Sequence, residues 1–475
     1  MSDELIQIKY TLDTINYNSD KIRTKLYTVN GTSPSPSHMT HQYKILNYDL
    51  ICDNDDSLGL YRSIIVSHPE NKIVCFSPPK SVTLDHFKET NPEITNPDIF
   101  INEIIEGTMI NLFYDSRIES WQIATKGAIG GNYSFYKMGP AVAVAATSES
   151  AAAPPPMTFR QMFLDALRVP SGQDINDFVG FADFSKDYCY NFVLQHPQNH
   201  IVLSIPYPVV YLVSVYHIVG DPDNQVVYIP PTVYEEWDCF LGLRGLIEFP
   251  KHLNDEVHSV QAAQAAAVTA QAAAAAQAQT AAAQAQTAAT ETSYTSLTEK
   301  YGSPLLESYE TMGCMIMNLK TGMRTTIINP KYTEVRELRG NNPNLCYQYL
   351  CLKRMGKVMD FLEHFPQYKN VFYRFHTQYE NFITNIHQAY LIYYVKKSGI
   401  KIAKRYFQII YKLHHEYYLP SLSSSDGKRI MRRSEIKQIM NKFEFNYVYT
   451  NFIHAEREKP EVCILDEPAC IPQEN

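Results

Sequence analysis

Apolar residues in the first two thirds of the chain recur in short runs rich in β-branched and aromatic side chains, a pattern typical of β-strands. Several runs come in pairs around turn residues such as His68-Pro69-Glu70-Asn71, and each pair predicts a hairpin. The predicted hairpins join residues 61–66 to 72–76, residues 104–114 to 121–125, and residues 314–318 to 324–328. Residues 188–193 and 201–218 predict two further strands, and residues 158–167 predict a helix.

The spacing of apolar residues changes after residue 347. Phe382, Ile386 and Tyr390 lie four positions apart, and Tyr406 and Leu413 lie two helical turns apart in the next apolar stretch. This spacing places the side chains on one face of a helix. The last third of the chain is therefore predicted to be all-helical.

Together the two patterns predict an α+β protein. We expect an antiparallel-sheet-rich body over residues 1–345, a helical domain over residues 346–460 and a tail over residues 461–475. Low-complexity segments interrupt the body at residues 141–157 and 258–292. Both segments are rich in alanine and lack an apolar stripe, so we interpret them as surface insertions that leave the core intact.

Composition narrows the classes of protein. No apolar run reaches the roughly 18 residues of a membrane-spanning helix. The start, Met1-Ser2-Asp3-Glu4, is acidic and differs from a signal peptide. The nine cysteines form no C-x-x-C pair and no metal-ligand spacing with histidine. We expect an intracellular, cytoplasmic protein with no bound metal and no membrane partner, and leave association with a virion open.

The formal net charge of −8 hides a basic segment. Residues 391–450 hold twelve Lys and Arg against four Asp and Glu. Basic side chains among aromatic ones are typical of surfaces that bind nucleic acid. The alternatives are that these cations form an ordinary solvated helix face, or that they bind a protein partner. The candidate residues are Lys396, Lys397, Lys401, Lys404, Arg405, Lys428, Arg429, Arg432 and Arg433.

Several short motifs within residues 42–340 follow one another in a recognisable order. They are Tyr61-Arg62-Ser63-Ile64-Ile65, Pro79-Lys80, Glu106-Gly107-Thr108-Met109-Ile110, Thr125-Lys126-Gly127, Asp187-Tyr188-Cys189-Tyr190-Asn191-Phe192, Pro197-Gln198-Asn199-His200-Ile201-Val202, Gly313-Cys314-Met315-Ile316 and residues 327–332. In this order the motifs resemble those of the ATP-dependent RNA ligases of bacteriophages and large DNA viruses. The resemblance implies a covalent nucleotidyltransferase fold.

The resemblance also implies a chemistry. In such ligases a lysine amine attacks the α-phosphorus of ATP, and the resulting lysine-linked AMP is passed to an RNA 5′-phosphate. Carboxylates hold a divalent metal, and further lysines neutralise the transferring phosphate. A helical C-terminal domain holds the RNA.

The sequence departs from that pattern at the residues that perform the chemistry. The nucleophilic lysine falls on Ile104, which cannot form the phosphoramidate bond. Two motif glutamates fall on Val193 and Met312, and the two lysines of the last motif fall on Thr326 and Ile328. The resemblance therefore predicts a degenerate ligase fold that has lost catalysis.

Five matching residues still predict a nucleotide cleft: Arg62, Lys80, Glu106, Gly107 and Lys126. Three functions stay open. The first is an inactive RNA ligase-like scaffold that binds RNA, another nucleic acid or a protein and needs no cofactor. The second is a divergent active RNA ligase with a relocated lysine, which would use ATP and Mg²⁺. The third is a structural or virion assembly protein.

Overall fold

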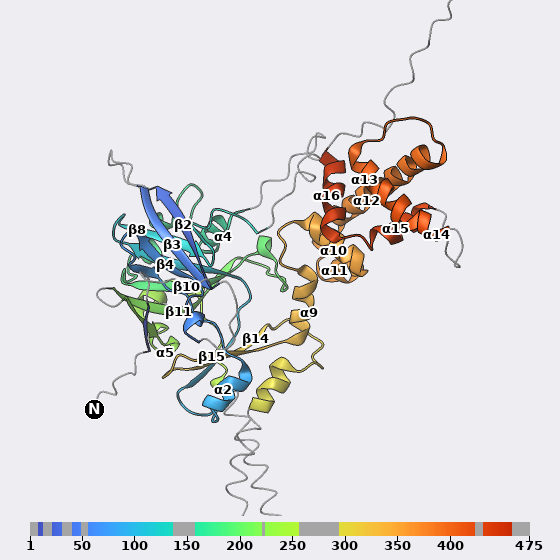
Figure 1. The fold of residues 1–475 in the computed structure, drawn as a ribbon. Helices are drawn as coiled ribbons and strands as arrows, with labels where there is room; N and C mark the ends of the chain where they lie inside the picture. The colour runs from blue at the N-terminus through green and yellow to red at the C-terminus, as the bar shows by residue number, and fades with distance from the viewer. Residues whose placement is uncertain are drawn as a thin grey trace, which may run out of the picture. The chain divides into compact units, whose positions relative to one another are not determined.

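The computed structural model describes residues 8–12, 21–30, 40–48, 56–135, 157–220, 224–255, 294–422 and 431–457 (Figure 1). These residues form two compact units. The first, here called the body, ends at Arg336, and the helical unit begins at Glu337 and also includes Phe135. The predicted tail, the insertion predicted at 258–292 and residues 141–156 of the other insertion lie outside the described residues.

The body contains three sheets, in which antiparallel pairing predominates. The largest sheet has the order β1 (Lys9–Thr11), β12 (Gln225–Ile229), β11 (Val209–Gly220), β10 (Tyr188–Gln195), β7 (Thr108–Asp115), β8 (Ser120–Thr125) and β9 (Ala128–Ile129), and β13 (Ile247–Glu248) pairs parallel to β11. The second sheet has the order β2 (Ile22–Asn30), β3 (Thr40–Tyr48), β4 (Ile64–His68) and β5 (Ile73–Cys75). The third has the order β15 (Arg324–Ile328), β14 (Gly313–Asn318) and β6 (Ile99–Glu103).

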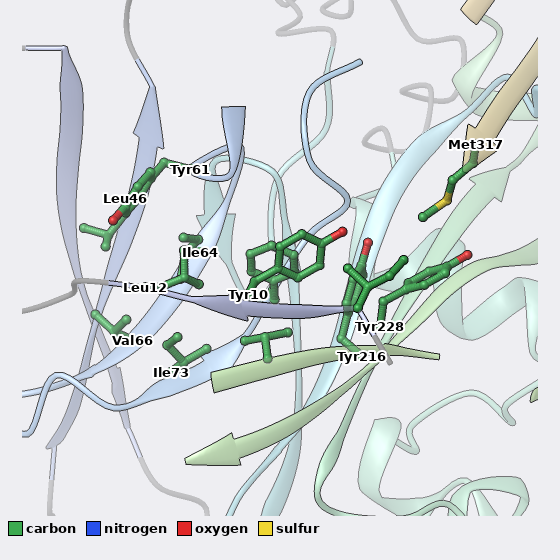
Figure 2. Close-up of a cluster of buried hydrophobic side chains, with 13 residues drawn as sticks. Tyr10, Leu12, Leu46, Tyr61, Ile64, Val66, Ile73, Tyr216, Tyr228 and Met317 are labelled. Carbon is green, nitrogen blue, oxygen red and sulfur yellow. The ribbon is translucent and has the colours of Figure 1, made fainter. Parts of the chain in front are cut away.

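One buried cluster joins all three sheets. Figure 2 shows Tyr10, Tyr216 and Tyr228 from the largest sheet near Met317 from β14, with Leu46 and other side chains of the β2–β5 sheet in the same cluster. Burial of these side chains supplies the hydrophobic free energy that holds the sheets together. The sheets therefore meet around a shared core, and their neighbouring edges can enclose a cavity.

Short helices cover the remaining faces of the body. The N-cap of α4 is Thr158, whose side chain and that of Gln161 form a reciprocal capping box. Phe87 of α2 packs with Cys314 and Ile327 of the third sheet and with Tyr294 of a helix over residues 294–302. The body helices are α1 (Asp56–Gly59), α2 (Leu84–Thr90), α4 (Phe159–Ala166), α5 (Pro231–Tyr234), α6 (Asp238–Leu241) and α9 (Pro330–Arg339), which ends in the helical unit.

The helical unit is built around α12 (Lys369–Tyr390), which lies among the other helices of the unit in Figure 1. The buried residues of α12 recur every three or four positions. Phe382 contacts Tyr406 of α13 and Phe452 of α16, with ring centroids 6.2 and 5.6 Å away. The other elements are α10 (Leu345–Met355), α11 (Val358–His364), the π-helical segments η6 (Leu391–Val395) and η7 (Leu413–Tyr418), α13 (Lys404–Lys412), α14 (Leu419–Ser421), α15 (Arg433–Met440) and α16 (Phe445–Arg457).

The structure confirms the predicted α+β class, the three hairpins, the helix after Thr158 and the helical last third. Three boundaries were wrong. Residues 61–63 form a turn before β4, and residues 104–107 separate β6 from β7. Residues 201–208 are irregular because Pro206 and Pro208 cannot donate to a strand ladder, so β11 begins at Val209.

In the described part of the chain, no helix is long and apolar enough to cross a membrane.

Candidate functional site

A cavity of about 470 Å³ lies in the body, where loops and strands of all three sheets meet. The cleft residues expected from the sequence all line it: Arg62, Lys80, Glu106, Gly107 and Lys126. All the degenerate positions line it as well: Ile104, Val193, Met312, Thr326 and Ile328. The structure therefore brings together ten residues that the sequence distributes over more than 260 positions.

Strand alternation explains one wall of the cavity. On β15, Arg324, Thr326 and Ile328 line the cavity, while the intervening Thr325 and Ile327 are buried on the opposite face. Thr326 pairs with Met315 of β14, which pairs with Asn102 of β6, so the wall crosses the third sheet in register. Because successive side chains point to opposite faces, this hairpin can present only alternate residues to a ligand.

Part of the cavity lining is apolar. Val193 of β10 pairs directly with Met109 of β7 in the largest sheet, and both line the cavity. The amide of Ile104 donates to the carbonyl of Gly313, the residue paired with Ile328. Ile104 therefore lies close to Ile328, and the two side chains add an apolar surface to the cavity lining.

Five cations line the cavity: Arg62, Lys80, Lys126, Arg324 and Arg336. The pKa of Arg62 is lowered, first by burial and then by the positive charge of Arg324. The pKa of Lys126 is lowered by desolvation and then by the charge of Arg62. Among the described residues, no carboxylate forms an ion pair with Arg62, Lys126 or Arg324. The three cations repel one another, and an anion between them would relieve that repulsion.

The two lining carboxylates are already engaged by backbone amides. Glu106 is buried, and its carboxylate accepts hydrogen bonds from the amides of Val202 and Leu203 at 3.0–3.3 Å. Glu103 Oε1 accepts one from the Lys251 amide at 2.8 Å. Glu106 therefore orders the loop after β10 and forms no ion pair with the three mutually repelling cations.

Among the described residues, two buried polar atoms of cavity-lining side chains have no hydrogen-bond partner: Oδ1 of Asn102, an acceptor, and Nε of Arg324, a donor. Such groups are costly to bury unsatisfied. The neighbouring Nη2 of Arg324 lies 2.7 Å from Sδ of Met315, which is a weak acceptor.

Backbone contacts hold the loop that carries Lys126. The hydroxyl of Ser63 donates to the carbonyl of Lys126 at 3.0 Å, and the hydroxyl of Tyr27 donates to the carbonyl of Gly127. The ammonium of Lys126 lies 5.4 Å from the ring centroid of Tyr48. Lys126 is thus fixed beside Arg62, the residue that precedes Ser63.

Gly107 is required by close packing. A Cβ built at Gly107 would lie 2.4 Å from the carbonyl oxygen of Leu194 and 2.6 Å from Cγ1 of Val193. No side chain fits at that distance, so glycine permits the turn between β6 and β7 to approach β10. The glycine of this motif therefore has a structural explanation that is independent of catalysis.

The helical unit distributes the basic candidates unevenly. Lys396, Lys397, Lys401, Lys404 and Arg432 are exposed, and Arg405 is half-buried with its guanidinium 5.1 Å from the Tyr406 ring. Arg433 instead forms an ion pair with Glu380 at 2.5 Å. Lys428 and Arg429 lie outside the described residues. Arg433 is therefore neutralised within the unit, whereas the lysines between η6 and α13 face solvent.

Sequence reasoning did not single out several residues of the cavity, among them Asn102, Arg324 and Arg336. The predicted hairpin held a signal for Arg324, because a residue two positions before Thr326 must share its face. Asn102 lies on β6, a strand that was not predicted, and nothing in the sequence pattern singled out Arg336 of α9. Comparison of the chain with models of known protein families and with curated proteins finds no match.

Proposed function

We propose that the chain is a catalytically inactive RNA ligase-like protein whose body binds an anionic nucleotide in this cavity without forming a lysine–AMP bond. The observation that carries the proposal is the composition of one cavity. It keeps a cluster of cations but has an isoleucine at the nucleophile position and apolar residues where carboxylates would lie. The helical unit would bind a nucleic acid or a protein partner through its exposed lysines.

The residues that line the cavity favour a nucleotide over a bare inorganic anion. Phosphate oxygens are acceptors that match the charged groups of Arg62, Lys126 and Arg324. A nucleotide base supplies an apolar face that matches the side chains of Met109 and Val193 in the cavity lining. A bare inorganic anion would satisfy only the cations.

The cavity lining offers Mg²⁺ two carboxylates, Glu103 and Glu106, and both are already hydrogen-bonded. This ion prefers oxygen ligands, commonly carboxylates, and both Glu103 and Glu106 already accept backbone hydrogen bonds. Within the described ranges no group of three or more His, Cys, Asp or Glu side chains lies close enough together to hold a metal. A divalent ion would therefore enter mainly through the phosphates of the nucleotide.

The proposal is tested by equilibrium dialysis of the full chain against ATP, ADP and AMP. We expect reversible binding that Arg324→Met weakens about tenfold to a hundredfold, since a hydrogen bond to a charged group contributes about 1.5–3 kcal/mol. Lys331→Met is the matched control because Lys331 pairs with Glu334 at 2.8 Å and does not line the cavity. Absence of nucleotide binding by the unmodified chain would reject the proposal and favour a purely structural protein.

A second candidate is a divergent active ligase, favoured by one observation: Lys80 and Lys126 line the same cavity as Ile104. The lowered pKa of Lys126, caused by desolvation and the charge of Arg62, increases the fraction of neutral amine. This candidate requires a covalent AMP adduct that Lys80→Met or Lys126→Met abolishes.

A further inference from the structure

The helical unit carries a continuous row of aromatic rings that reaches the surface. Tyr393 of η6 contacts Phe407 of α13 with ring centroids 5.3 Å apart, and Phe407 contacts Tyr411 at 6.2 Å. Tyr411 in turn lies 4.1 Å from the ring of His415 in η7. Tyr393 is 42% exposed and Tyr411 49% exposed, so both ends of the row keep ring surface open to solvent.

A second layer of rings fixes this row from behind. The ring of Tyr394 stacks on His414 with centroids 3.7 Å apart and an interplanar angle of 10°. The hydroxyl of Tyr390 lies 3.0 Å from Nδ1 of His414, and Tyr418 stacks on the same imidazole at 5.1 Å. η6 and η7 are π-helical, a rare geometry that is frequent at functional sites. The exposed rings are therefore held in place before any ligand arrives.

The row lies within a segment that is strongly positive. Residues 381–415 contain six Lys and Arg and no Asp or Glu. Lys404, Phe407 and Tyr411 lie at positions i, i+3 and i+7 of α13, so one helix face presents an exposed lysine beside the rings. Lys396 and Lys397 are exposed directly after η6. Lys412 differs, because its ammonium points at the Tyr447 ring of α16, 4.9 Å away.

We propose that the Tyr393–Phe407–Tyr411 row and its flanking lysines form a binding surface for single-stranded nucleic acid, in which exposed tyrosine rings stack on unpaired bases and the lysines pair with phosphates. The proposal deepens the proposed function and rests on its assignment of the helical unit to a partner. Exposed rings need bases that are not already paired, which favours a single strand over a duplex. An acidic protein would use the lysines but not the ring faces.

The test uses fluorescence anisotropy of the full chain with a fluorescein-labelled single-stranded oligouridylate, its duplex with oligoadenylate, and the matching DNA strand. We expect the single strand to bind more tightly than the duplex. Tyr393→Ala with Tyr411→Ala should weaken that binding about tenfold or more, since stacking on one ring contributes about a fivefold to hundredfold factor. Tyr393→Phe with Tyr411→Phe should bind like the unmodified chain. Tyr373→Ala is the control, because Tyr373 is 71% exposed and lies outside the row.

The dependence of binding on salt concentration distinguishes the contribution of the lysines from that of the aromatic rings. Lys396→Ala with Lys397→Ala should reduce the slope of log affinity against log salt by about 1.4, or about 0.7 for each phosphate that a lysine no longer neutralises. The tyrosine variants should leave that slope unchanged. The inference would be overturned if the affinity for the single strand did not change when both tyrosines are replaced by alanine. It would also be overturned if the duplex bound as tightly as the single strand. Equal binding of polyglutamate would overturn it in favour of an acidic protein partner.

Nucleotide binding by the same variants distinguishes this inference from the proposed function. The tyrosine variants should bind ATP in the body as the unmodified chain does. If ATP does not bind but tyrosine-dependent binding of the single strand persists, the proposed function fails alone. If ATP binds and the single strand is bound independently of the tyrosines, this inference fails alone.

Discussion

Glu106 lines the cavity, but its contacts give it a structural role rather than a chemical one. Its carboxylate accepts hydrogen bonds from two backbone amides and is only 3% exposed. Arg62, Lys126 and Arg324 form no ion pair with it, although they lie along the same lining. The carboxylate thus stabilises the loop at Val202 and Leu203, a structural role that does not involve catalysis.

Glu106→Ala should lower the free energy of unfolding by about 3 kcal/mol, because two buried amides lose a charged acceptor. Glu106→Gln should cost less, since its amide oxygen still accepts. Urea denaturation of both variants checks this. Equal stability of Glu106→Ala and the unmodified chain would contradict the structural role.

We expect the contribution of Asp115 to the free energy of unfolding to depend on pH. Burial alone would raise its pKa, but hydrogen bonds from Arg117 and Tyr43 outweigh burial and lower the pKa below its usual value. Tyr43 donates to Oδ2 of Asp115 at 2.6 Å and links β3 to the end of β7. A carboxyl with a lowered folded-state pKa stabilises the fold above its unfolded pKa of about 4, and that stabilisation is lost as the pH falls through the folded value.

Asp115→Asn should therefore cost about 2 kcal/mol of unfolding free energy at pH 7, and the difference from the unmodified chain should shrink below about pH 4. Urea denaturation at several pH values measures it. Asp183→Asn is a suitable control for a general effect of removing a carboxylate, since Asp183 is exposed in the turn after Phe181. A constant difference down to pH 2 would contradict the assigned role.

At the scale of elements, hairpins and the capped helix were predictable because they depend on local sequence. The turn at Lys320–Gly322 and the capping pair Thr158 and Gln161 specify their elements within a few residues. β6 was missed because its pairing with β14 is set by residues more than 200 positions away. Arg324 was missed for a different reason: its strand was predicted, but the shared face with Thr326 was not used.

An ion-pair cluster links three helices of the helical unit and neutralises some of its basic side chains. Glu380 of α12 pairs with Arg433 and Lys437 of α15 at 2.5 and 2.6 Å and with Lys353 of α10 at 3.7 Å. Burial would raise the pKa of Glu380, but hydrogen bonds from Lys437 and Arg433 outweigh burial and lower it. The ion pair of Arg433 with Glu380 thus joins α15 to α12 and neutralises the charge of Arg433 within the unit.

Glu380→Gln should lower the free energy of unfolding of the helical unit by about 1 kcal/mol, a modest value because Arg433 and Lys437 are substantially exposed to screening solvent. Arg432→Ala, at the neighbouring exposed position, should change stability little. Thermal denaturation of both variants checks the comparison. A larger loss from Arg432→Ala than from Glu380→Gln would contradict this view of the cluster.

At the scale of the molecule, the net charge of −8 divides into two parts with different consequences. Residues 391–450 carry the surplus of basic side chains, and most of those described between residues 396 and 405 are exposed. The body is acidic in sum, yet its cavity is lined by five cations and two engaged carboxylates. Local charge, rather than the sum, indicates where anions would bind.

We propose that the body binds a nucleotide but does not react with it. The most direct measurement incubates the full chain with α-phosphate-labelled ATP and Mg²⁺, then compares label held by the native protein with label held after denaturation. We expect label on the native protein that is released completely on denaturation, because Ile104 cannot form a phosphoramidate. Label that survives denaturation on a lysine would contradict the claim and identify an active ligase.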